Sequence, residues 1–296
     1  MPEPTPFDVE IFSECFEPAR SDAGSGDSTD QGDPLSVVLP ILLVSGADAH
    51  CTRWTPTLIE PLVALGHRVV RYDHRDSGLS TKVPVDVGYT LDALADDALT
   101  VMDAHGIDRA HVIGRSMGGM VGQVLALDHA ERVATLTLVC STPGLGDERL
   151  PVAEDWLLDR MTERLFAGPP HVETDRAAWI VEQDEMFAGT RFAEPTASRI
   201  RTAVAEVARC WYPESGHGAA VGASPSRLDR LDDIGVPTLV VHGTADPVFS
   251  VDHALALAEG IPGADLWLVE DLGHELPDGL VPDLVDRLRE HLTRTT

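Results

Sequence analysis

The amino-acid sequence predicts an α/β protein with a mostly parallel central sheet, helices on both faces of that sheet, and an all-helical cap inserted between two strands. Three observations lead to this expectation. Short apolar runs alternate with longer segments of helical apolar spacing, a helical stretch interrupts the alternation, and a glycine-rich turn joins one predicted strand directly to a helix. Continuous apolar runs of about four to eight residues are typical of strands that are buried on both faces, as in a parallel sheet.

Six apolar runs are the candidate strands, and five amphipathic segments are the candidate helices. The expected strands are 37–44, 68–72, 111–114, 136–140, 238–241 and 265–269. The expected helices are 54–65, 91–105, 117–127, 251–261 and 280–292. Because strand and helix alternate, right-handed connections would place these helices on both faces of one sheet.

Two departures from this alternation divide the chain into regions. Residues 1–36 contain a predicted N-terminal strand or hairpin and a flexible acidic loop at 19–34, which is rich in Ser, Asp and Gly. Residues 145–226 have helical spacing and no convincing strand, so they are the predicted cap. Residues 37–144 and 227–296 form the predicted α/β core.

Acidic residues dominate the charge of the 296-residue chain. Its 49 Asp and Glu outnumber its 22 Lys and Arg, which gives a formal net charge of −27. Such a surface repels phosphate backbones and anionic lipid headgroups, so neither nucleic acid nor a membrane is an expected partner. No apolar run approaches the roughly 18 residues of a membrane span, and the N-terminus lacks the basic and apolar regions of a signal peptide. We therefore expect a cytoplasmic protein, either a monomer or a homodimer.

The cysteines and histidines form no metal-binding pattern. The four cysteines, Cys15, Cys51, Cys140 and Cys210, are scattered along the chain and include no C-x-x-C pair. The twelve histidines include no H-E-x-x-H motif and no Cys/His cluster with ligand spacing. The sequence therefore predicts neither a metal site nor another cofactor.

The segment Gly114-Arg115-Ser116-Met117-Gly118 lies between an apolar run and a predicted helix. This is G-x-S-x-G in the strand–turn–helix context of a serine nucleophile. The turn is so sharp that the residues two before and two after the serine must be small, and Gly114 and Gly118 meet this demand. The Ser116 hydroxyl would lie at a helix N-terminus, where free amides favour negative charge. The alternative is a tight turn in which Ser116 only caps the helix.

A serine hydroxyl needs an adjacent base, itself oriented by an acid, to act as a nucleophile. Asp246 lies in the turn after the predicted strand 238–241, and His274 lies in the loop after the next strand. Both positions follow the C-terminal ends of strands, where parallel sheets place their active sites. The turn after 136–140 has no carboxylate and Asp252 lies inside a predicted helix, so Asp246 is the preferred acid. The alternative is that both are ordinary turn and loop residues.

Binding of a developing oxyanion needs two N–H donors. By position, one donor is the amide of Met117, directly after the serine, and the other is the amide of Ala47, in the loop after the first parallel strand. Because these are backbone groups, only their place in the chain supports the assignment.

Aromatic residues gather in the predicted cap, where residues 147–225 contain seven of the fifteen in the chain. The candidate pocket residues among them are Trp156, Trp179, Phe187, Trp211 and Tyr212. They predict an apolar pocket that faces Ser116. Such a pocket suits a hydrophobic small-molecule substrate with a bulky or polycyclic acyl group. The alternative is that they form the core of the cap itself, and the two interpretations are compatible.

Nearly all of the predicted core and cap resembles the α/β-hydrolase superfamily of serine esterases. The G-x-S-x-G motif, the Asp246 turn and the His274 loop match the pattern of that family, and residues 71–80 resemble the loop after its second parallel strand. The similarity is greatest to the branch that contains actinobacterial anthracycline methylesterases and cofactor-free haloperoxidase-like hydrolases. Ser45-Gly46 replaces the frequent His-Gly pair of the family, and the acidic loop at 19–34 is a second departure.

The resemblance implies a hydrolase that cleaves a carboxylic ester of a bulky hydrophobic metabolite, as in a tailoring step of antibiotic biosynthesis. Ser116, His274 and Asp246 would form its catalytic triad, and the reaction would pass through an acyl-enzyme without a cofactor. The same triad acts on amides or peptides, lactones and C–C bonds in other members, so these bonds are alternatives. A further alternative is a ligand-binding protein on the same fold that catalyses no reaction.

Overall fold

The computed structural model describes residues 8–19, 38–84 and 86–294. Within them, seven strands form one sheet in the order β1-β3-β2-β4-β5-β6-β7. The strand β1 (Ser13–Phe16) runs antiparallel to β3, and all other neighbouring strands are parallel. The predicted mostly parallel sheet is thus confirmed. Of the acidic loop predicted at 19–34, all but Ala19 lies outside the described residues.

The parallel strands lie where the apolar runs predict them, although several ends differ by a few residues. They are β2 (Ile41–Val44), β3 (Val69–Tyr72), β4 (Ala110–Arg115), β5 (Val133–Val139), β6 (Thr238–Gly243) and β7 (Asp265–Val269). Every residue of β2, β3, β5 and β6 is buried, whereas the edge strand β7 is half-exposed. Because the central strands are covered on both faces, their sequences are apolar throughout rather than alternating.

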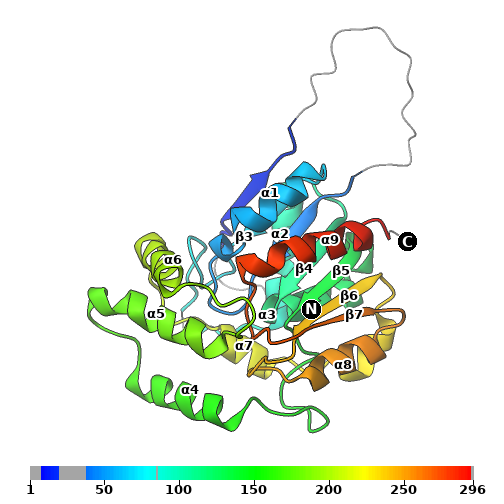
Figure 1. Ribbon diagram of the computed structural model, residues 1–296. Helices are drawn as coiled ribbons and strands as arrows, with labels where there is room; N and C mark the ends of the chain where they lie inside the picture. Colours follow the sequence, from blue (N-terminus) through cyan, green and yellow to red (C-terminus); the bar gives the residue numbers. More distant parts are fainter. Residues whose placement is uncertain (1–7, 20–37, 85, 295–296) are drawn as a thin grey trace, which may run out of the picture.

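Five helices of the core cover both faces of the sheet (Figure 1). On one face, α1 (Pro56–Ala64) and α9 (Val281–His291) pack over one hydrophobic cluster. On the other face, α2 (Leu91–Ala104), α3 (Met117–Asp128) and α8 (Val251–Gly260) pack over a second cluster. Four short 3-10 helices lie in connections: η1 (Cys51–Arg53), η2 (Ala130–Arg132), η3 (Leu228–Asp233) and η4 (Asp278–Leu280).

The segment between β5 and β6 is helical, and among its described residues it contains no strand. Its helices are α4 (Asp155–Ala167), α5 (Glu173–Phe187), α6 (Thr196–Arg209) and α7 (His217–Ala223). Figure 1 shows α4, α5 and α6 beside the sheet, at the left of the view, and we call α4 to α7 the cap. The apolar spacing of the sequence predicts three of these helices, around 156–165, 177–185 and 200–207, and not α7. In the described part of the chain, no helix has the length and apolarity to cross a membrane.

Ion pairs tie the cap to the core at three points. They are Arg53 with Glu206 and Asp184, Arg209 with Asp73, and Arg199 with Glu275. Most of these side chains are buried or nearly so, and each pair joins α5 or α6 to a loop of the core. Pairs of this kind are weak contributors to stability when intact, but removing one partner leaves an uncompensated charge.

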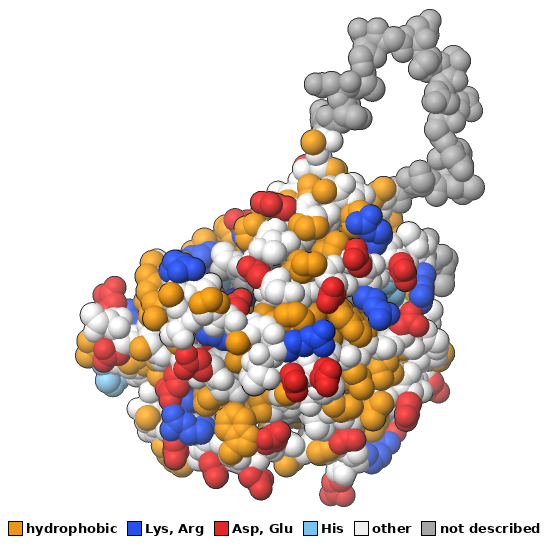
Figure 2. Space-filling view, viewed as in Figure 1, with side chains coloured by type: hydrophobic (Ala, Val, Ile, Leu, Met, Phe, Trp, Pro, Cys, Tyr) orange, Lys and Arg blue, Asp and Glu red, His pale blue; other side chains and the backbone are white. Residues whose placement is uncertain are grey.

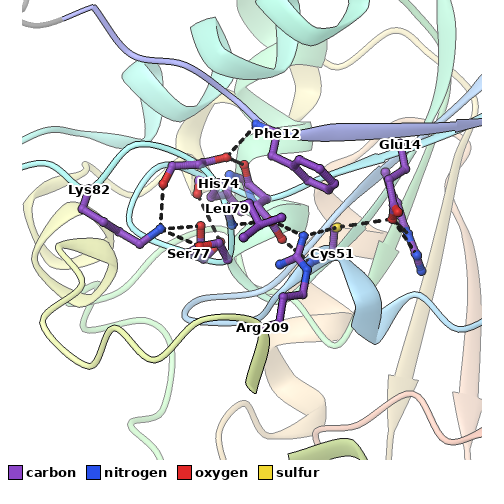
Figure 3. A network of polar contacts seen from close by, with 12 residues as sticks. Phe12, Glu14, Cys51, His74, Ser77, Leu79, Lys82 and Arg209 are labelled. Atoms are coloured by element: carbon purple, nitrogen blue, oxygen red, sulfur yellow. Dashed lines mark hydrogen bonds and ion pairs between the residues drawn. The ribbon is translucent and has the colours of Figure 1, made fainter. Parts of the chain in front are cut away.

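The Asp73 carboxylate is the centre of one of these attachments. Cys51, Leu79 and Arg209, which all donate to it, lie close together in Figure 3. Its Oδ1 accepts the amide of Cys51 at 2.7 Å, and its Oδ2 accepts the amide of Leu79 at 2.8 Å and Nη2 of Arg209 at 2.6 Å. Burial acts to raise the pKa of Asp73, but these hydrogen bonds outweigh it and hold the pKa below its usual value. Asp73 is therefore an ionised carboxylate that anchors the end of α6.

Replacing Asp73 by Ala should lower the free energy of unfolding by about 3 kcal/mol, because it leaves a guanidinium, the buried Cys51 amide and the half-buried Leu79 amide without this acceptor. As a control, Asp128→Ala removes the exposed ion pair with Arg230 and should change stability by less than about 1 kcal/mol. Urea denaturation of both variants measures the two effects. Equal losses would contradict the assignment of Asp73 as an anchor of the cap.

Candidate active site

The backbone at Ser116 is strained. Ser116 connects β4 to α3 with φ 54° and ψ −120°. This φ lies in the positive range that residues other than glycine rarely adopt. Two hydrogen bonds to the β5 side of the sheet hold it there: its amide donates to the Val139 carbonyl, and Ser141 Oγ donates to its own carbonyl, both at 2.9 Å. A strained backbone that the surrounding structure holds in place is typical of functional sites.

Two glycines of the motif make this turn sterically feasible. A Cβ atom on Gly114 would lie 2.2 Å from the Gly118 carbonyl oxygen, and one on Gly118 would lie 2.1 Å from the Val44 carbonyl oxygen. Either distance is a severe overlap with backbone, so the strand and the helix approach each other only because both residues lack side chains. These two close contacts therefore explain why the motif requires small residues at both positions.

The structure brings Ser116, His274 and Asp246 together at the carboxyl edge of the sheet. His274 Nε2 lies 2.9 Å from Ser116 Oγ, and His274 Nδ1 lies 2.8 Å from Asp246 Oδ2. The three residues follow β4, β7 and β6, respectively, and both Asp246 and His274 are buried. The resulting chain of hydrogen bonds runs from hydroxyl through imidazole to carboxylate.

The Asp246 carboxylate is fixed and ionised. Its Oδ1 accepts the amides of Val248 and Phe249 at 2.8 and 2.9 Å. Burial acts to raise the pKa of Asp246, but the charge and hydrogen bond of His274, with a smaller contribution from His242, hold that pKa below its usual value. An ionised Asp246 accepts a hydrogen bond from Nδ1–H of His274, which leaves the Nε2 lone pair directed at Ser116.

Aromatic rings and a backbone contact orient His274. The rings of Phe249 and Phe187 meet it edge-on, with centroids at 5.3 and 5.7 Å, and its amide donates to the Phe187 carbonyl at 2.7 Å. Arg115 Nη2 donates to the His274 carbonyl at 3.2 Å. Since Phe187 ends α5, the cap takes part in holding the imidazole in place.

The loop after β2 lies against Ser116. A Cβ atom on Gly46 would be 3.4 Å from Ser116 Cβ and 3.9 Å from Ser116 Oγ, so the backbone of Gly46 and Ala47 passes close to the hydroxyl. Met117 is the first residue of α3, and its amide is one of those that have no acceptor within a helix. The loop that carries one predicted oxyanion donor, Ala47, thus lies against Ser116, and the other donor, Met117, directly follows Ser116 in the chain.

A cavity of about 140 Å³ lies between the loop after β2 and the cap. It reaches the site through Ala47, Arg115 and Phe187, whereas Ser116, the residue that the predicted pocket should face, is not part of its lining. Four of the predicted pocket residues line it, namely Trp179, Phe187, Trp211 and Tyr212. The fifth predicted pocket residue, Trp156, does not line this cavity, so the expectation for it is wrong. Trp156 lies on α4, is 47% exposed and donates its Nε1 proton to Glu154, because α4 turns that side chain to solvent.

Polar groups line much of the same cavity, which corrects the expectation of an apolar pocket. They belong to Asp48, His50, Arg53, Arg115, Gln183, Asp184 and Glu206. Arg53 is paired with the last two acids, whose positions are 131 and 153 residues away in the sequence. Such distant pairs leave no local pattern, which is why the sequence analysis missed them. Arg115, by contrast, belongs to the G-x-S-x-G motif, so its place beside Ser116 could be read from the sequence. Its Nε is buried and has no hydrogen-bond partner among the described residues.

Cys140, Asp246 and His274 place three potential ligand atoms within 4.8 Å of one another. Two of these atoms, His274 Nδ1 and Asp246 Oδ2, are already hydrogen-bonded to each other. Burial raises the pKa of the Cys140 thiol far above its usual value, so the sulfur keeps its proton and donates weakly to the Gly273 carbonyl. All three groups are thus engaged in hydrogen bonds, with one another or with the backbone.

The lowered pKa of Asp246 gives the stability of the protein a defined pH dependence. Since its folded-state pKa lies below the unfolded value of about 3.9, Asp246 stabilises the fold fully at higher pH and loses this contribution as pH falls through the folded-state pKa. The difference in unfolding free energy between wild type and Asp246→Asn should thus be constant near neutral pH and shrink below about pH 4. Urea denaturation across this range tests it, and a difference independent of pH would contradict it.

Comparisons with known proteins agree with this geometry. The α/β hydrolase fold family matches residues 40–278. A rhodomycin D methylesterase of Streptomyces peucetius is 31% identical over 285 residues, which cover 90% of this chain and 94% of that protein. RutD of Variovorax paradoxus, provisionally named a carbamate hydrolase, is 32% identical over 239 residues, which cover 79% of this chain and 84% of that protein.

The fold of this chain is also similar to that of a solved structure. Est816, described as an N-acyl homoserine lactone degrading enzyme, superimposes with a TM-score of 0.69 at 25% identity, over 95% of this chain and 96% of that one. The family match spans most of the chain, and the first relative is similar over nearly its whole length. The chain therefore belongs to the α/β-hydrolase fold family and is an enzyme of the hydrolase class.

Proposed function

We propose that this protein cleaves a carboxylic ester through an acyl-enzyme on Ser116. The observation that carries the proposal is the continuous hydrogen-bonded chain from Ser116 Oγ through His274 to Asp246, at 2.9 and 2.8 Å. This is the arrangement that activates a serine hydroxyl, because the imidazole can accept its proton and the carboxylate stabilises the imidazolium that forms. The similarity to a rhodomycin D methylesterase supports an ester as the substrate.

In the first half of the proposed reaction, His274 Nε2 takes the Ser116 proton as Oγ attacks the ester carbonyl carbon. The amides of Ala47 and Met117 donate to the resulting oxyanion. The tetrahedral intermediate then collapses, and Nε2–H protonates the departing alcohol. In the second half, His274 deprotonates a water that attacks the acyl-enzyme, which releases the carboxylic acid and restores Ser116. No cofactor takes part in these steps.

We propose a bulky hydrophobic metabolite as the substrate, consistent with a tailoring step of secondary metabolism. Trp179 and Trp211 meet edge-on in the cavity wall, with ring centroids 5.8 Å apart, and offer flat apolar surface. A cavity of about 150 Å³ admits one benzene-sized ring, so the observed 140 Å³ suits one ring of a larger molecule. The polar half of the lining would bind oxygen substituents on that ring system.

The acidic surface bears on the partners of the protein. Figure 2 shows acidic side chains spread over the whole visible face rather than gathered in one patch. With a net charge of −27, such a surface disfavours nucleic acids and anionic membranes as partners. We therefore propose a cytoplasmic enzyme that acts on a small molecule as a monomer or a homodimer.

A lactone is the second candidate substrate, because Est816, the N-acyl homoserine lactone degrading enzyme, has the same fold over nearly its whole length. A lactone is a cyclic ester and would follow the same steps, with the alcohol retained on the acyl group. Parallel assays on open esters, lactones and amides of similar size would rank these bonds by kcat/KM.

Incubation with a fluorophosphonate should add one phosphonyl group to the wild type and none to Ser116→Ala, as measured by intact-protein mass spectrometry. Ester hydrolysis should fall about 10⁴-fold or more in the same variant, because the nucleophile is lost while binding remains. Hydrolysis that survives in a folded Ser116→Ala would contradict the proposal. A wild type that binds esters but forms no adduct would favour a ligand-binding protein without turnover.

Replacing Trp211 by Ala should lower the preference for aromatic acyl groups. The ratio of kcat/KM for a benzoyl ester to that for an acetyl ester should fall about 2- to 10-fold, the size of one lost aromatic contact. Trp156→Ala is the matched control, since it removes the same side chain from outside the cavity, and it should leave the ratio unchanged. Equal effects of the two substitutions would contradict the assignment of the cavity as the acyl site.

A further inference from the structure

We propose that His217, which is fully buried at the start of cap helix α7, is a positioning residue that fixes the peptide group next to Ala47. This inference rests on the proposed function, because the direction of the Ala47 amide matters there as an oxyanion donor. Neither the sequence motif nor the Ser116–His274–Asp246 chain involves His217, which comes from a different segment of the protein.

The hydrogen bonds of His217 define a single tautomer. Its Nδ1 lies 2.9 Å from the amide nitrogen of Asp48, and its Nε2 lies 2.8 Å from the carbonyl oxygen of Arg75. A carbonyl oxygen can only accept, so Nε2 carries the proton. A backbone amide can only donate, so Nδ1 offers its lone pair. Two backbone groups thus fix the orientation of the ring, one at each ring nitrogen.

A second histidine holds the other end of the same loop. His74 Nε2 donates to the Ser45 carbonyl at 3.1 Å, and burial lowers the pKa of His74 to about 3, so the His74 ring is neutral. Both ends of the segment 45–48 are therefore attached: its first carbonyl to His74 and its last amide to His217. The peptide that carries the Ala47 N–H lies between these two fixed points.

The loop needs such support because its backbone is strained at Asp48, where φ is 60° in a residue other than glycine. Without an acceptor for the Asp48 amide, the peptide after Ala47 is free to rotate toward a relaxed conformation. The Asp48 carboxylate lies 3.2 Å from the same Nδ1 but accepts the Ser215 hydroxyl, so it does not replace the amide contact. Gly46 is in contact with Ser116, so a rotation here changes the distance between the Ala47 amide and the oxyanion.

This arrangement makes the cap a part of the catalytic geometry. His217 and Asp48 are 169 residues apart in the sequence, and the contact joins α7 to the loop after β2. The cap would then do more than enclose the substrate, since one of its side chains directs a backbone donor of the core.

The experiment compares two substitutions that each keep half of the imidazole. His217→Asn places a carbonyl oxygen near the position of Nδ1 and can still accept the Asp48 amide. His217→Gln extends to the position of Nε2 and can still donate to Arg75, but it offers nothing to the Asp48 amide. His291→Gln is the matched control, because His291 is also buried and also contacts a carbonyl, that of Leu136, far from this loop.

Steady-state kinetics with an ester and thermal unfolding are measured for all three variants. We expect kcat to fall about 10- to 100-fold in His217→Gln with KM nearly unchanged, since a misplaced donor weakens binding of the transition state alone. His217→Asn should regain most of this loss. His291→Gln should lower the unfolding temperature without lowering kcat.

Two results would overturn the inference: a His217→Gln variant with wild-type kcat, or equal losses of kcat in the Asn and Gln variants that follow their losses of stability. Failure of the proposed function itself looks different. In that case the wild type would hydrolyse no ester and form no Ser116 adduct, before any variant of His217 is compared.

Discussion

The strained backbone at Ser116 is the constraint on which the rest of this site depends. A left-handed conformation at the junction of β4 and α3 lifts the hydroxyl out of the sheet edge, and it exists only because Gly114 and Gly118 allow strand and helix to touch. The surrounding structure holds this conformation with hydrogen bonds from β5 and its following turn. Once the hydroxyl is placed, the loops after β6 and β7 need only deliver a carboxylate and an imidazole to the same edge, which parallel topology does by default.

The cap is bound to this edge by polar contacts more than by a shared apolar core. Asp73 holds the end of α6, Arg53 joins α5 and α6 to η1, and Glu275, next to His274, holds Arg199. The attachment of Arg53 to Asp184 and Glu206 lines the cavity, so groups that fasten the cap also contribute to the polar character of the cavity. The same contacts bring Phe187 against the imidazole and α7 against the loop after β2. Contacts between cap and core therefore shape both the cavity wall and the surroundings of His274.

The core elements and the Ser–His–Asp arrangement could be predicted because each has a local signature. Buried parallel strands are apolar runs, and Ser116, Asp246 and His274 each follow directly after one. Contacts that link remote segments have no such signature: nothing in the sequence near Arg53 or His217 announces Glu206 or Asp48. The short helix α7 was missed because its Gly- and Ala-rich sequence has little apolar periodicity. Trp156 was misplaced because composition identifies an aromatic side chain but not the direction in which its helix turns it.

The central claim is that the backbone amides of Ala47 and Met117 bind the oxyanion above Ser116. A crystal structure of the enzyme with a phosphonate bonded to Ser116 Oγ tests it most directly, since the phosphoryl oxygen occupies the place of the oxyanion. The account predicts that this oxygen lies within about 3.2 Å of both amide nitrogens, the limit of a normal N–H···O hydrogen bond. An oxygen directed instead at the Arg115 guanidinium, with neither amide in range, would contradict it.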